Sequence, residues 1–144
     1  ESVKFHNAFS LQKREKEHIN LFIKLVRDAD KLDIWRVFLE HFEGPPETMA
    51  DAITLGLPDT PEYSREVLSH ILKKETAPHL QIRTLNDFKL LQLSWVFDLN
   101  FKPTFELLSE RAYIDRLASH LPQTEEIRQA TMFVKEFLRQ RLKE

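Results

Sequence analysis

Apolar residues recur at spacings of three and four along most of the chain, and few stretches alternate with the period of two that marks a half-buried strand. Leu, Glu, Lys and Arg predominate and favour helices, whereas glycine occurs only twice. The pattern predicts an all-α fold, a helical bundle of about five to seven helices. The 144 residues are enough for one domain of ordinary size, so residues 1–144 are assigned to a single helical domain.

The first part of the chain contains two predicted helices. A short helix covers residues 1–9, and a long one runs from about residue 14 to residue 42, with a bend near Arg27. The stretch Glu43-Gly44-Pro45-Pro46 ends the long helix, because Gly suits a C-terminal cap and Pro cannot continue a helix. Residues 44–61 contain four prolines and are predicted to form a long connection.

Capping signals place the remaining helices. Pro61 suits the first turn of a helix, and Thr84 with Asp87 resembles a capping box in which Asp replaces the usual Glu. Thr124 is followed by two acids, which favours a helix start there. These signals predict helices over residues 60–74, 84–99, 102–121 and 124–143.

The segment Arg27-Asp28-Ala29-Asp30-Lys31-Leu32-Asp33 places three carboxylates within six residues of an otherwise apolar helix. A buried carboxylate is unfavourable unless a cation, a metal or hydrogen bonds compensate it. The cluster therefore indicates a functional site on this helix. The structural alternative is a carboxylate at a helix bend, held by an Arg or Lys of a neighbouring helix.

Helix geometry separates the first two of these acids. A helix advances about 100° per residue, so Asp28 and Asp30 point in roughly opposite directions. Asp30 is expected to point inward or into a cleft, and Asp28 to be solvated or paired with Arg27 or Lys31. The face of Asp30 also carries Val26, Asp33, Ile34 and Val37.

Two further residues are candidates for a site. His6, followed by Asn7, is one because His is a common metal ligand and acid–base group; the alternative is a hydrogen-bonded histidine of the core or surface. Asp98 lies among apolar residues and is interpreted as a helix-end carboxylate bonded to a backbone amide or to an Arg. The other five histidines do not have zinc-ligand spacing.

Composition excludes several functions. The net charge of −2 and the interleaved acids and bases argue against nucleic-acid binding and against an anionic membrane surface. No apolar run approaches the ~20 residues of a membrane span. The absence of cysteine excludes disulfides and thiolate chemistry and favours a cytoplasmic location. Without a Gly-rich phosphate loop or a G-x-S-x-G elbow, catalysis would be metal-assisted or based on carboxylate and His.

The string RDADKLD at residues 27–33 resembles the last conserved segment of the HD superfamily of metal-dependent phosphohydrolases. Their site combines a His, a His-Asp doublet and a distant Asp in an ADKL or ADRL context. The resemblance implies an HD-domain-like helical bundle in which Asp30 is a metal ligand. The pair His6-Asn7 resembles a His-Asn pair near the metal pocket of one bacterial branch, and residues 95–101 resemble the C-terminal helices of that branch.

The chain departs from this family in one respect: no histidine is followed by Asp, so the His-Asp doublet and the His before it are absent. In the family these residues lie N-terminal to the His-Asn segment. We therefore expect the chain to be the C-terminal part of a longer HD-type domain, or a remnant that does not assemble the site. One Asp and one His are too few ligands for a tightly bound metal, so a divalent metal ion is implied only if the missing ligands are supplied upstream.

Three functions follow as hypotheses. In the first, an HD-type phosphohydrolase, Asp30 and His6 are the catalytic and metal-binding residues, and Asn7, Arg27 and Lys31 contact a small phosphorylated substrate, a phosphate ester or a nucleotide. The second is a non-catalytic binding or regulatory domain descended from the HD fold. The third is a bundle that forms a homo-oligomer, for which eleven Phe residues supply apolar surface.

Overall fold

The computed structural model of the chain describes the backbone of residues 2–44 and 54–144, and the side chains of residues 12–44 and 54–144. Within these ranges the chain forms six α-helices, two short 3-10 helices and no strand, which confirms an all-α bundle. The α-helices are α1 (Ser2–Glu43), α3 (Arg65–Leu72), α4 (Leu85–Ser94), α5 (Lys102–Glu110), α6 (Tyr113–Ala118) and α7 (Glu125–Lys143). The 3-10 helices are η2 (His79–Gln81) and η3 (Trp95–Asp98).

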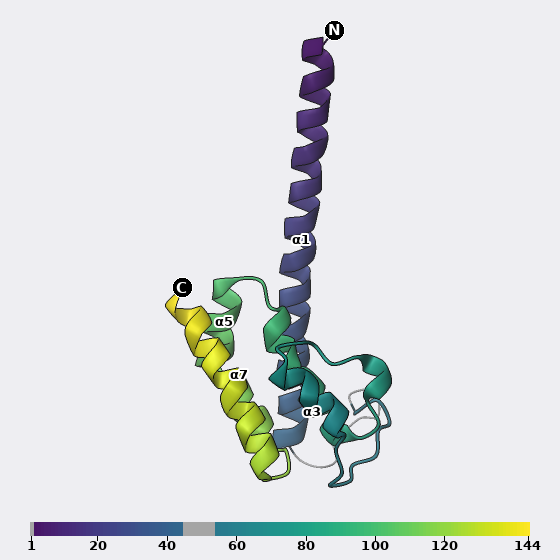
Figure 1. Ribbon diagram of the computed structural model, residues 1–144, viewed down its shortest axis with the longest axis vertical. Helices are drawn as coiled ribbons and strands as arrows, with labels where there is room; N and C mark the ends of the chain where they lie inside the picture. Colours follow the sequence, from purple (N-terminus) through teal and green to yellow (C-terminus); the bar gives the residue numbers. More distant parts are fainter. Residues whose placement is uncertain (1, 45–53) are drawn as a thin grey trace.

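Helix α1 is one uninterrupted helix, where two had been predicted. Residues 10–13 contain no Pro or Gly that would break it. Its 42 residues correspond to a length of about 63 Å. Figure 1 shows the first half of α1 projecting from the bundle, while the second half packs against the other helices. Every residue from 12 to 27 is exposed, and the helix ends at Glu43, as predicted.

Helix α4 lies at the centre of the bundle. Every residue from Leu85 to Val96 is buried, and α3, α6 and α7 contact α4. The second half of α1 closes the core with Trp35, which lies 5.9 Å from Trp95 between ring centroids, and with Phe38, which meets Phe88 edge-on at 5.4 Å. No described helix combines the length and the apolar character needed to cross a membrane.

The capping box of α4 is confirmed: the Thr84 hydroxyl accepts the Asp87 N–H, and the Asp87 carboxylate accepts the Thr84 N–H. The same carboxylate accepts the backbone N–H of Ser64 at 2.6 Å and its hydroxyl at 2.8 Å. This contact holds the chain before α3, so that α3 starts at Arg65 and not near Thr60. The predicted cap of α7 at Thr124 is also confirmed.

Two predicted helices are divided in the structure. The helix expected over residues 84–99 consists of α4 and η3. The helix expected over residues 102–121 consists of α5 and α6, because Ala112 between them adopts a φ of 53° in the left-handed region, which ends an α-helix. Neither Gly nor Pro marks this break in the sequence.

Candidate functional site on helix α1

The buried carboxylate of the acidic segment is Asp28. Its side chain is 3% exposed, and its oxygens accept four donors from the segment before α5 and from its first turn. The backbone N–H groups of Asn100 and Phe101 both donate at 3.1 Å, the Asn100 side-chain amide at 3.0 Å and the Thr104 hydroxyl at 2.6 Å. Hydrogen bonds alone therefore compensate the charge, and the expectation that Asp28 is solvated or paired with Arg27 or Lys31 was wrong.

These hydrogen bonds give Asp28 a structural role. Phe101 is the N-cap residue of α5 and has no side-chain oxygen that could accept the free N–H groups at the helix start. Asp28 accepts the N–H of Phe101 from α1, and a negative charge near a helix N-terminus is favoured by the helix dipole. The contact joins α1 to α5 across more than seventy residues of sequence.

Asp30 is exposed, so the prediction that it points inward was wrong. It follows Asp28 by two residues, which is more than half a turn, and the two carboxylates lie on opposite sides of α1. The side of Asp28 also carries Trp35 and Leu39, which enter the core, whereas the side of Asp30 faces away from the bundle. Asp30 is surrounded there by apolar residues that are 40–48% exposed, namely Ile23, Val26 and Ile34.

Arg27 and Lys31 are both paired with Asp98. One carboxylate oxygen of Asp98 lies 2.6 Å from a terminal nitrogen of Arg27 and 2.9 Å from the Lys31 ammonium. Burial raises the pKa of Asp98, but the two cations outweigh it and the pKa lies below its ordinary value. The interpretation of Asp98 as a helix-end carboxylate bonded to an Arg is confirmed. The Arg27 side chain stays 57% exposed, and that of Lys31 is 12% exposed.

His6 and Asn7 belong to the first turns of α1, and their side chains lie outside the described residues. Because α1 is one helix, the 24 residues from His6 to Asp30 correspond to about 36 Å along its axis. The structure therefore does not bring His6 and Asp30 together within one chain. Their joint role as metal ligands would require a different path of the chain between them.

The described side chains do not form a metal site. No group of three or more His, Cys, Asp or Glu side chains in the described part of the chain is close enough to hold a metal ion. A tightly bound catalytic metal needs three or more protein ligands of this kind, and Asp30 would supply one. The residues present therefore fit, at most, one part of the divalent-metal site that the HD resemblance implies.

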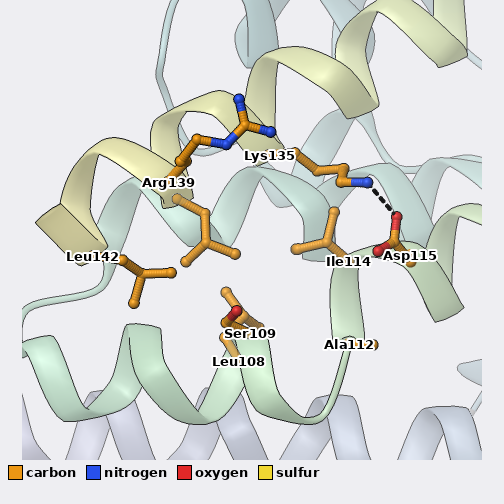
Figure 2. Close-up of a pocket in the computed structure, with 9 residues that line it drawn as sticks. Leu108, Ser109, Ala112, Ile114, Asp115, Lys135, Arg139 and Leu142 are labelled. Atoms are coloured by element: carbon orange, nitrogen blue, oxygen red, sulfur yellow. Dashed lines mark ion pairs between the residues drawn. The ribbon is translucent and has the colours of Figure 1, made fainter.

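A cavity of about 200 Å³ lies between α5, α6 and α7, away from these residues. Figure 2 shows its apolar lining from Leu108, Ile114 and Leu142, with Lys135 and Asp115 paired at its edge at 2.8 Å. Its other charged residue, Arg139, is paired with Glu136 at 2.6 Å. The charged groups of the cavity thus have partners already, and none of the residues singled out in the sequence lies in it.

Lys89 is a buried charge that the sequence analysis missed. Its side chain is on the central helix α4 and only 4% of the residue is exposed. The ammonium donates to the backbone carbonyl of His120 at 2.8 Å and lies 4.5 Å from the centroid of the Phe42 ring. Burial lowers the pKa of Lys89. The sequence signal for this buried charge was a lysine between Phe88 and Leu90 in a helix with a predicted cap. The contacts of Lys89 connect α4 to the end of α1 and to the segment after α6.

The described geometry leaves Asp30, on an apolar and exposed helix face with Arg27 beside it, as the candidate site. No protein-family model, no curated protein and no solved structure matches this chain. The resemblance of residues 27–33 to the HD superfamily therefore stands on those residues alone.

Proposed function

We propose that this chain contributes the aspartate-bearing part of an HD-type metal-dependent phosphohydrolase, with a phosphate ester or a nucleotide as substrate. Asp30 is the proposed ligand of a divalent metal ion. The remaining ligands must come from residues outside the described part of the chain, because the described side chains form no group of three or more that could hold a metal ion. The proposal rests on the RDADKLD string and on one structural observation, the position of Asp30 on an uncovered apolar face.

Asp30 is a charged residue among exposed apolar residues. The apolar neighbours of Asp30 on α1 are 40–48% exposed, and contiguous exposed apolar surface is typical of an interaction site. An element that covered this surface would also take Asp30 out of water. A buried carboxylate is tolerated only when a cation, a metal or hydrogen-bond donors accompany it. The covering element would therefore have to bring such a group to Asp30, which supports a role as metal ligand.

Arg27 is the proposed phosphate contact. It is one turn before Lys31 on α1 and borders the face of Asp30. Asp98 holds one terminal nitrogen of its guanidinium, while the side chain remains 57% exposed. A guanidinium has five N–H donors in a rigid fork that suits phosphate oxygens. Lys31 is more enclosed and pairs with the same carboxylate oxygen of Asp98 as Arg27. Its proposed role is to support the ion pair between Arg27 and Asp98.

The experiment uses the complete product of the gene. Metal content by mass spectrometry and hydrolysis of phosphate esters and nucleotides are measured for the wild type, for Asp30→Ala and for Asp115→Ala. Asp115 is an exposed aspartate of α6 that pairs with Lys135 at the surface, so its variant is the matched control. We expect Asp30→Ala to abolish bound metal and activity, and Asp115→Ala to change neither. Absence of metal and activity from the wild-type product would refute the proposal.

The second candidate is a non-catalytic binding or regulatory domain. It is favoured by the contacts of Asp28 and Asp98, since hydrogen bonds and ion pairs within the fold account for both acids without any chemistry. In this case Asp30→Ala leaves metal content and stability unchanged, and only substitutions of the exposed apolar residues of α1 weaken partner binding. Loss of metal from Asp30→Ala would exclude this candidate.

A further inference from the structure

The exposed part of α1, residues 12–27, carries four large apolar side chains on one side. Ile19, Phe22, Ile23 and Val26 are 57%, 66%, 48% and 41% exposed. Their spacings of three and four residues align them along the helix, and we call these four residues the α1 stripe. A stripe of this kind on a helix is the usual contact surface of a helix pair.

We propose that a second copy of this chain covers the α1 stripe, in an antiparallel pair of α1 helices centred on Ile23. The charges at the two ends of the α1 stripe identify a second copy of this chain as the partner. Lys16 and Asp30 are both exposed and lie seven residues, about two helical turns, before and after Ile23. In an antiparallel pair centred on Ile23, Lys16 of each copy therefore lies opposite Asp30 of the other.

The same charges disfavour a parallel pair. There, each residue of α1 would face its own counterpart, so Lys16 would meet Lys16 and Asp30 would meet Asp30. Like charges at such distances repel, whereas the antiparallel order makes two ion pairs of opposite charge. A buried Asp30 also gains the cation that burial requires. Charge complementarity thus selects the antiparallel order.

The apolar side chains of the α1 stripe fit this order. With Ile23 at the centre, Ile19 of one copy lies beside Val26 of the other, and the two Ile23 side chains meet. The two Phe22 side chains lie on the same edge of the pair, next to each other. The centre of the pair is therefore apolar and its ends carry the ion pairs, as in a stable helix–helix contact.

Within residues 12–44 and 54–144, no element covers this side of α1 between Ile19 and Asp30, and the residues on it are exposed. Asp28 contacts the start of α5 from the side of α1 opposite to Asp30, and Figure 1 shows the first half of α1 clear of the other helices. The inference does not depend on the proposed phosphohydrolase function. Because Asp30 cannot bind Lys16 of a second copy and a metal ion at once, the paired chain would be a form without a completed metal site.

The mass of this chain in solution is the first test, by sedimentation equilibrium over a wide range of concentrations. We expect a monomer–dimer equilibrium. Ile23→Asp places two carboxylates at the centre of the pair and should raise the dimer dissociation constant at least about 100-fold. Leu80→Asp, at a residue of η2 that is 97% exposed, is the control and should have no effect. A wild-type chain that stays monomeric, or a dimer insensitive to Ile23→Asp, would overturn the inference.

Charge exchange and cross-linking test the order of the helices. Lys16→Glu and Asp30→Lys should each weaken the dimer, and the double variant should restore it; circular dichroism verifies that each variant keeps its helix content. Since the chain has no cysteine, a maleimide cross-linker can act only at introduced thiols. The variant with both Lys16→Cys and Asp30→Cys should cross-link two chains. Efficient cross-linking of Lys16→Cys alone would indicate a parallel pair and overturn the proposed order.

Discussion

Replacing Asp28 by Ala is the most direct test of how the fold uses its acidic segment. Asp28 is 3% exposed and its carboxylate accepts donors from the start of α5. Asp28→Ala leaves these donors without an acceptor and removes the negative charge near the N-terminus of α5. The change also removes the contact that fixes α1 against α5.

The expected loss in the free energy of unfolding follows from the four donors that the Asp28 carboxylate accepts. Asn100 is exposed, so water can replace the carboxylate at its backbone and side-chain N–H groups. The Phe101 N–H and the Thr104 hydroxyl are more enclosed, and an unsatisfied buried donor costs about 1–3 kcal/mol. Together with the lost charge at the helix N-terminus, we expect a loss of about 3–5 kcal/mol in the free energy of unfolding. For a chain of this length that lowers Tm by roughly 10–15 °C.

Urea unfolding followed by tryptophan fluorescence is the assay, because Trp35 and Trp95 are both buried in the core. Asp30→Ala is the matched control: the same substitution, two residues further along α1, at an exposed position. At concentrations where the chain is monomeric, we expect the control to change the free energy of unfolding by less than about 0.5 kcal/mol. The reasoning fails if Asp28→Ala loses less than about 1 kcal/mol, or if both variants lose equally.

Two further predictions concern the ion pairs of α1 and the backbone between α5 and α6. Lys31 and Arg27 lower the pKa of Asp98 below its ordinary 3.8, so the two ion pairs should stabilise the fold fully above pH 3.8 and less as the pH falls through the lowered pKa. The difference in urea midpoint between the wild type and Asp98→Asn should therefore shrink on acidification. A difference that stays constant with pH would contradict this prediction. Ala112→Gly relieves the left-handed φ of 53° and should raise stability by about 0.5–1 kcal/mol, whereas Ala29→Gly, at an exposed position within α1, should lower it by about 1 kcal/mol.

Local signals in the sequence were sufficient to predict the features whose interacting residues lie a few positions apart. The all-α class follows from apolar spacing, and the end of α1 at Glu43 follows from the Gly and Pro residues after it. The capping box of Thr84 and Asp87 is built within four residues, so its sequence pattern was enough to identify it. The role of Asp30 as a metal ligand is a proposal that no observation of the fold tests.

Contacts between segments far apart in the sequence decided which face of α1 is buried and where α3 starts. Helix periodicity separated the faces of Asp28 and Asp30, but both faces carry apolar residues, so the sequence alone did not show which one packs. The donors at Asn100, Phe101 and Thr104 decide it in favour of Asp28. Likewise, α3 starts where the Asp87 carboxylate binds Ser64, 23 residues away. A carboxylate's partner depends on which elements meet in space, and helix periodicity records only the direction in which each side chain leaves its own helix.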